Sequence, residues 1–169
     1  MAMFKQVADI KTADMLDLPV PEVEYHNIAV KPSQVQKDMV ASLGERAEKI
    51  RGGGIDSSVD NMLKVTNDGR KLALDQRMMN PMLPDEEGSK VNACVNEVYR
   101  IWEENSDKKL TQLLFCDLST PKSAGEFSVY TDIRKKLIER GIPESEIKFI
   151  HEADTETKKQ ELFKKVRRG

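Results

Sequence analysis

The chain has 169 residues and a formal net charge of -2, with 33% charged and 5% aromatic residues. This length fits one domain, or one and a half, and allows a core that needs no disulfide or metal to hold it. The near-balanced charge excludes a chain that is basic over its whole surface. No apolar run approaches the ~18 residues of a membrane span and no signal peptide opens the chain, so we expect a cytoplasmic protein.

Residues 1–32 are predicted to form an extended lead-in segment. Val23–Val30 contains β-branched and aromatic residues and is predicted to be a strand. Ser33 follows, with Gln36 three residues later, and this spacing predicts a reciprocal capping box at the start of a helix. The apolar spacing continues until three glycines, Gly52–Gly54, end the helix.

Residues 33–88 are predicted to form a helical subregion. A second helix is expected over Asp56–Asn67, with Asp68 and Gly69 ending it and a helical turn through Arg70–Met79 before Pro81. Ser89 is predicted to cap the clearest helix in the chain. The apolar stripe of that helix consists of Val91, Cys94, Val95, Val98, Ile101 and Trp102.

Residues 89–169 then change to a strand, helix, strand, helix order. The predicted strands are Leu110–Cys116 and Ile147–Ile150; the first predicted helix runs from Phe127 to Ile138, and Asp154 or Thr155 caps the second. Alternation of this kind indicates parallel β-α-β packing. The predicted fold class is therefore α/β, with a partial RecA-like parallel sheet over residues 108–169 and a mainly helical segment before it.

Ligands of open parallel sheets collect beyond the carboxyl ends of the strands. Hydroxyl groups, a lysine and a helix N-terminus at those positions suit phosphate oxygens, although ordinary loop and capping roles explain the same residues equally well. A basic stripe from Lys158 to Arg168 is typical of a solvated helix face and also suits phosphates. The candidate phosphate or nucleic-acid contacts are Ser119, Thr120, Lys122, His151, Thr155 and Lys159.

The sequence contains no catalytic set. No G-x-x-x-x-G-K-[ST] motif is present, so the chain has no triphosphate site of its own. His151 has no nucleophile near it in sequence, and Cys94 and Cys116 lack the spacing of a zinc site. We therefore expect the chain alone to catalyse nothing and to bind neither a metal nor a cofactor.

Five segments, in chain order, resemble the second motor lobe of Swi2/Snf2-type superfamily 2 helicases. A Leu-Pro segment precedes a Ser/Gln helix start, a helix ends in an Asn-Pro pair, and a Ser-Lys helix precedes an apolar strand that resembles helicase motif IV. The last segment is similar to the next block of the family. The five segments are DLPVPEVEYHNIAVKPSQVQKDMV, LALDQRMMNP, GSKVNACVNEVYRIWEEN, QLLFCDLST and FIHEADTETKKQELFKKVRRG.

The resemblance implies a front portion of a RecA-like lobe that contacts a DNA backbone, with Lys90, Phe115 and Asp117 as motif-bearing residues. More narrowly, the segments look like those of the large helicase–methylase proteins of phages and conjugative elements. Glu152 stands where the family has glycine. Lys159 stands where the family has arginine, and lysine lacks the planar fork with which arginine makes bidentate contacts. Motifs V and VI are absent, so ATP and Mg²⁺ are expected to bind only in a full-length parent that includes the first RecA-like lobe in cis.

Two other functions fit the sequence. The helical front half, residues 33–105, could dock a protein partner as a stand-alone interaction module. A small α/β phosphate-binding protein could use Ser119, Thr120, Lys122 and His151. A truncated sheet would also leave an unpaired edge, and self-association of the chain through that edge is expected.

Overall fold

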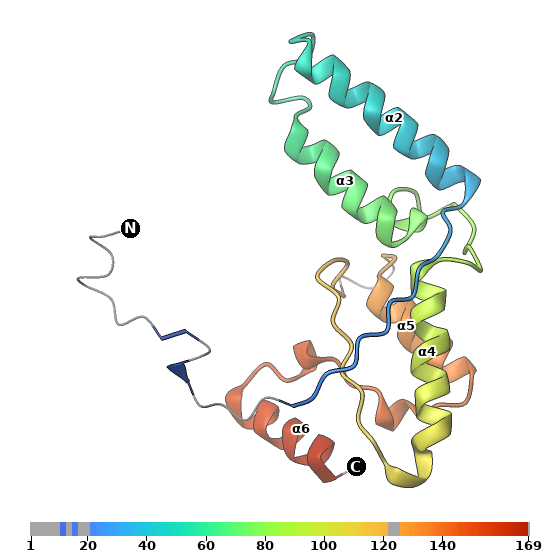
Figure 1. Cartoon of the computed structure of the whole chain (residues 1–169), viewed down its shortest axis with the longest axis vertical. Helices are drawn as coiled ribbons and strands as arrows, with labels where there is room; N and C mark the ends of the chain where they lie inside the picture. The colour runs from blue at the N-terminus through green and yellow to red at the C-terminus, as the bar shows by residue number, and fades with distance from the viewer. Residues whose placement is uncertain (1–10, 13–14, 17–20, 122–125, 169) are drawn as a thin grey trace.

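The computed structural model describes residues 11–12, 15–16, 21–121 and 126–168. In this part of the chain the secondary structure is helical. The α-helices are α2 (Gln34–Arg51), α3 (Met62–Leu74), α4 (Lys90–Asn105), α5 (Val129–Glu139) and α6 (Glu156–Arg168), and the 3-10 helices are η2 (Gln76–Met78), η3 (Ser106–Lys108), η4 (Glu144–Glu146) and η5 (Ile150–Glu152). Figure 1 shows α2 and α3 side by side, projecting from the part of the molecule that contains α4 and α5.

Helix α2 begins and ends where the sequence predicts. The Ser33 hydroxyl accepts a hydrogen bond from the Gln36 backbone N–H, and the Gln36 side chain accepts one from the Ser33 backbone N–H, so the predicted capping box is confirmed. At the other end Gly52 caps the helix, and Gly53 adopts a φ of +73°. Glycine is favoured there because a Cβ atom would crowd a left-handed backbone.

Helix α3 differs from its predicted limits at both ends. It begins at Met62, where Asn61 accepts from the Lys64 N–H, rather than at Asp56. Asp68 and Gly69 lie inside the helix instead of ending it. The reason is tertiary: Asp68 accepts a hydrogen bond from Arg46 of α2 at 2.9 Å. Arg46 also binds Asp60 at 2.9 Å, so one guanidinium group ties α2 to α3.

The hydrophobic core lies between α4 and α5. Ser89 caps α4 as predicted, with its hydroxyl accepting from the Asn92 N–H. Helix α5 ends before Gly141, which adopts a φ of +104° and turns the chain so that Ile142 is buried. The buried side chains of this core are Val91, Val95, Val129, Ile133, Leu137 and Ile142.

Trp102, the one tryptophan of the chain, packs against the edge of this core. Its indole Nε1–H donates to Glu146 at 2.8 Å. Glu146 belongs to η4, after α5, so this bond fixes the connection that follows α5 against the C-terminal half of α4. The ring centroid of Tyr99 lies 6.0 Å from that of Trp102.

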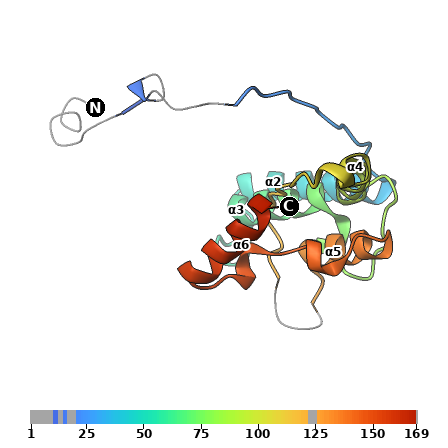
Figure 2. The same ribbon diagram turned by 90° about the horizontal axis from the view of Figure 1, so that it is seen from below.

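The predicted RecA-like parallel sheet is wrong for this structure: the described residues contain no strand, and β-α-β-α packing over residues 108–169 is not seen. Val23–Val30 is extended and mostly exposed, and Figure 2 shows that residues 21–33 lead away from the helices. Leu110–Cys116 has no regular secondary structure and runs stretched out in Figure 1. Ile147 and Phe149 are extended, but Ile150 already begins η5.

The physical reason is that a strand requires a hydrogen-bonded neighbour as well as an extended backbone. The apolar runs were predicted to be strands, but among the described residues neither run forms a ladder with the other. Side chains hold them instead. The Gln112 amide donates to the Val98 carbonyl of α4 at 2.9 Å, and the Thr111 hydroxyl donates to the Val166 carbonyl of α6 at 3.0 Å.

Candidate functional site

Ser119, a predicted phosphate contact, caps a helix in the structure. Its hydroxyl accepts from the Val129 N–H at 2.9 Å, and its carbonyl accepts from the buried Ser128 hydroxyl at 2.8 Å. Its φ of +59° directs both groups toward the start of α5. The hydroxyl is therefore already engaged with a helix N-terminus. Thr120 is exposed beside it, and Lys122 lies outside the described residues.

The ends of the two extended segments meet at Tyr130 of α5. The Tyr130 hydroxyl donates to the Cys116 carbonyl, at the end of the first segment. Its ring lies edge-on to Phe149, with centroids 5.6 Å apart, and to His151, with centroids 5.4 Å apart. Burial and the nearby Cys116 and Asp117 raise the pKa of Tyr130. His151 is thus placed near the residues that follow Leu110–Cys116, and its position is set by an aromatic contact.

Thr155 and Lys159 lie at the start of α6. The Thr155 hydroxyl accepts from the Lys158 N–H at 3.3 Å, which makes Thr155 the predicted cap of this helix. Lys159 is half-buried, on the same side of the helix as Leu162 and Val166. It therefore belongs to the inner face of α6 and is a poor candidate for a contact with an extended nucleic-acid backbone.

The outer side of α6 carries the exposed positive charge. We call Lys164, Lys165, Arg167 and Arg168 the basic face; all four are exposed, and none forms an ion pair with another described residue. Lys158, in contrast, binds Asp154 at 2.7 Å. Unpaired cations gathered on the last turns of one helix favour an anionic partner.

The motif-bearing residues have separate surroundings. Lys90 is the exposed first residue of α4. Phe115 is 90% exposed. Asp117 forms an exposed ion pair with Arg70 of α3. This pair connects the end of Leu110–Cys116 to the pair of helices α2 and α3, which we call the α2–α3 hairpin. The structure does not bring these three residues into one site.

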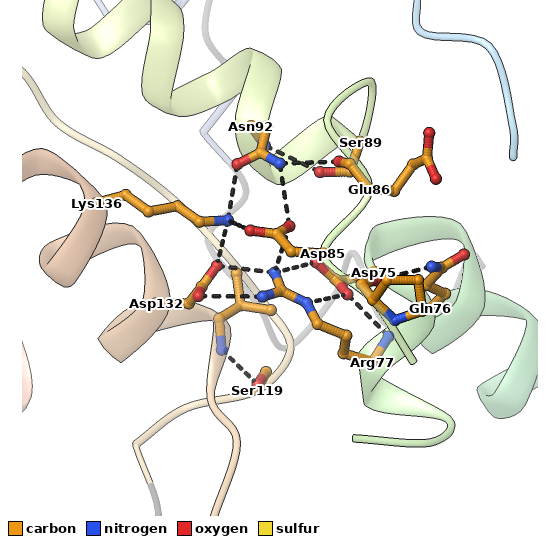
Figure 3. A network of polar contacts seen from close by, with 12 residues as sticks. Asp75, Gln76, Arg77, Asp85, Glu86, Ser89, Asn92, Ser119, Asp132 and Lys136 are labelled. Carbon is orange, nitrogen blue, oxygen red and sulfur yellow. Dashed lines mark hydrogen bonds and ion pairs between the residues drawn. The ribbon is translucent and has the colours of Figure 1, made fainter. Parts of the chain in front are cut away.

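Sequence reasoning missed a set of partly buried polar contacts, which we call the ion network and show in Figure 3. It consists of Asp75, Arg77, Asp85, Asn92, Asp132 and Lys136. These residues come from η2 and its flanking loops, from α4 and from α5. The Asp-x-Arg pattern at the end of α3 was a local signal, but its partner on α5 lies 55 residues further on.

Arg77 is the centre of the ion network. Its guanidinium group forms a fork with Asp75, at 2.9 and 2.7 Å, and a second fork with Asp132, at 3.2 and 2.8 Å. Asp75 is 2% exposed. Arg77 also covers the Phe127 ring, with its Cζ atom 4.5 Å from the centroid. Bidentate geometry of this kind gives strength and direction to a buried ion pair.

Lys136 completes the ion network on the side of α4. Its ammonium group binds Asp85 at 2.6 Å, Asp132 at 2.8 Å and the Asn92 side-chain oxygen at 2.7 Å. Each charged group of the network, three carboxylates and two cations, therefore has at least one oppositely charged partner. The network joins the base of the α2–α3 hairpin to the α4–α5 core, and its chemistry is that of a structural clamp.

Gln76 extends this clamp to the start of α2. Its side-chain oxygen accepts from the Ser33 hydroxyl at 2.8 Å, and its amide donates to the Pro84 carbonyl at 2.9 Å. The Gln36 amide donates to the Leu72 carbonyl at 2.9 Å. The segment LALDQRMMNP is therefore the junction at which the hairpin, the following loop and the core meet.

The Asp132→Asn variant is expected to lose less stability in acid than the wild-type protein. Burial tends to raise the pKa of Asp132, but hydrogen bonds from Arg77 and Lys136 outweigh burial and lower it. The unfolded pKa is about 3.9. The ionised carboxylate thus stabilises the fold above that pH, and this contribution is lost as the pH falls through the folded pKa. Urea unfolding at pH 7 and pH 3, followed by circular dichroism, measures the difference.

Asp107→Asn is the matched control, because Asp107 is exposed and has no ion partner among the described residues. Its loss of stability between pH 7 and pH 3 should equal that of the wild-type protein. An unchanged loss in Asp132→Asn would show that the Asp132 carboxylate does not stabilise the fold.

The described residues contain neither a cluster of metal-ligand side chains nor a helix that could span a membrane. No three His, Cys, Asp or Glu side chains gather there as ligands for a metal ion. None of the helices combines the length and the apolar character required to cross a bilayer. Comparisons with protein-family models, with curated proteins and with solved structures gave no match to the chain.

Proposed function

We propose that the chain supplies nucleic-acid backbone contacts to an ATP-dependent DNA helicase or translocase and hydrolyses no ATP by itself. The basic face of α6 carries this proposal, because Lys164, Lys165, Arg167 and Arg168 are exposed without a carboxylate partner among the described residues. The order of the five segments that resemble Swi2/Snf2-type motors supports it.

Within this proposal, the basic face binds phosphates without reading bases. ATP and Mg²⁺ bind elsewhere in the motor, on the lobe that carries a P-loop. The two cysteines, Cys94 and Cys116, are both unpaired thiols, which suits the reducing cytoplasm in which such a motor acts.

Substitution of the basic face is expected to weaken DNA binding and reduce its salt dependence. Non-specific binding of a labelled 20-base-pair duplex should have a dissociation constant of about 1–100 μM at physiological salt. In the variant with glutamine at Lys164, Lys165, Arg167 and Arg168, the slope of log affinity against log salt should fall by about 0.9 for each phosphate that the protein no longer neutralises. Fluorescence anisotropy at four salt concentrations measures both quantities.

A control variant separates a local contact from the effect of overall charge. Glutamine at Lys37, Lys49, Lys108 and Lys135 removes an equal number of positive charges, four, from exposed positions outside α6. This control should retain most of the wild-type affinity and slope. Equal losses in the two variants, or no DNA binding by the wild-type protein, would contradict the proposal. ATP turnover well above background would contradict its second part.

The α2–α3 hairpin favours a second candidate function, the docking of a protein partner. Val40 and Leu63 are 58% and 79% exposed, on the two helices that project from the core in Figure 1. Apolar side chains at such a position suit a helical interface. This function would be favoured if neither the basic-face variant nor its control lost DNA binding, and if a protein partner protected the hairpin from hydrogen exchange.

A further inference from the structure

We propose that Leu110–Cys116 is a self-association strand, which pairs antiparallel with the same segment of a second copy about a two-fold axis at Leu113. The segment contains no helix, turn or bend and runs stretched out in Figure 1; it is uncharged and contains neither glycine nor proline. These are the properties of short segments that pair strand to strand between chains. The proposed dimer goes beyond the nucleic-acid function and does not depend on it.

The backbone N–H and C=O groups of residues 111–115 are available for pairing with another strand. Among the described residues, no N–H or C=O group of residues 111–115 forms a hydrogen bond. Apolar side chains are exposed on the same segment: Leu113 is 75% exposed and Phe115 is 90% exposed. An extended backbone without a neighbour is a template for another strand.

The segment is also held in the shape that pairing requires. Gln112 and Cys116 point toward the core, since the Gln112 amide donates to the Val98 carbonyl and Cys116 packs at the core edge. Side chains alternate along an extended chain, so Leu113 and Phe115 share the opposite face. Leu110 and Leu114 are also 60% and 43% exposed, so most of the segment lies at the surface. Part of the conformational entropy that strand pairing would remove is therefore already lost before a second copy binds.

Charge complementarity identifies the occupant as a second copy in antiparallel orientation. Lys109 precedes the segment and Asp117 follows it. With the two-fold axis at Leu113, Thr111 of each copy lies opposite Phe115 of the other. Lys109, which has a φ of 51°, and Asp117, which lies in a bend, flank the paired residues, so Lys109 of one copy lies at the same end of the ladder as Asp117 of the other. Parallel pairing in register would instead place lysine on lysine and aspartate on aspartate, which is unfavourable. Asp117 is available because its pair with Arg70 is exposed, and exposed pairs are weak.

Disulfide trapping in the full chain tests this register. In a Cys94→Ala/Cys116→Ala background, Leu113→Cys places two thiols at the axis, where paired Cα atoms are about 4.5–5.5 Å apart and a disulfide can form. Phe115→Cys is the matched control, because its two copies would lie about 14 Å apart. We expect Leu113→Cys to give covalent dimers at least about tenfold faster than Phe115→Cys under mild oxidation.

Analytical ultracentrifugation supplies a second measurement that uses no cysteine. The wild-type protein should show a concentration-dependent dimer. Asp117→Lys and Lys109→Asp should each weaken it about two- to tenfold, and the double variant should restore it. A monomer at every concentration, equal trapping at both positions, or no restoration in the double variant would overturn the proposal.

Discussion

The Arg77→Met variant is expected to lower the free energy of unfolding by about 3–5 kcal/mol. Methionine fills much of the same space, but it leaves the carboxylates of Asp75 and Asp132 without their shared cation. Asp75 is 2% exposed, so water cannot replace the guanidinium group. Chemical denaturation followed by circular dichroism measures the change.

Arg100→Met is the matched control for this substitution. Arg100 also binds two carboxylates, Glu97 and Glu104, at 2.8 and 2.7 Å, but its side chain is 51% exposed. Exposed pairs of this kind contribute about 0–1 kcal/mol. Equal changes in the two variants would show that burial does not distinguish the ion network from a surface pair.

Leu72→Ala is expected to cost about 2–5 kcal/mol of unfolding free energy, because the substitution leaves a cavity in a packed interior. Leu72 is 1% exposed in α3, next to the junction with η2. Leu63→Ala, in the same helix, provides the control: Leu63 is 79% exposed, and its loss should change the free energy by no more than about 0.5 kcal/mol. Thermal and urea unfolding of the two variants should separate clearly, and a cost below about 1 kcal/mol for Leu72→Ala would contradict its role in packing.

The helices could be predicted from the sequence wherever their ends depend on neighbouring residues. Ser33 with Gln36, Ser89 and Gly141 each act within a few residues of the helix that they begin or end, and the structure confirms all three. The predicted start of α3 was wrong because Asp56 accepts hydrogen bonds from Ser58 in a separate turn, and Asn61 caps the helix. Asp68 and Gly69 remain helical because Arg46 of another helix binds Asp68.

The sheet could not be predicted because its existence depends on distant partners. The apolar composition of Leu110–Cys116 predicts a buried strand, but the segment has no regular secondary structure and is mostly exposed. Composition does not specify which backbone lies beside it, and among the described residues none does. The α/β fold class inferred from alternating runs was therefore wrong even though the runs themselves were real.

The candidate site was predicted in part. Ser119 and His151 both lie near Tyr130, but the Ser119 hydroxyl serves α5 and the His151 ring lies against an aromatic side chain. The basic stripe was recognised, while its division into an inner Lys159 and an outer basic face required the orientation of α6. Arg77 could not be predicted because an arginine two residues after an aspartate is common in exposed loops, and its burial arises from contacts with α5.

Trp102 can serve as an intrinsic fluorescence probe of the α4–α5 core. The indole is bonded to Glu146 and packs at the edge of the α4–α5 core, and no second tryptophan contributes to the emission. Its fluorescence therefore follows the opening of that core, whereas far-ultraviolet ellipticity follows every helix, including α2 and α3. If the two signals change at the same denaturant concentration, the hairpin and the core unfold as one cooperative unit.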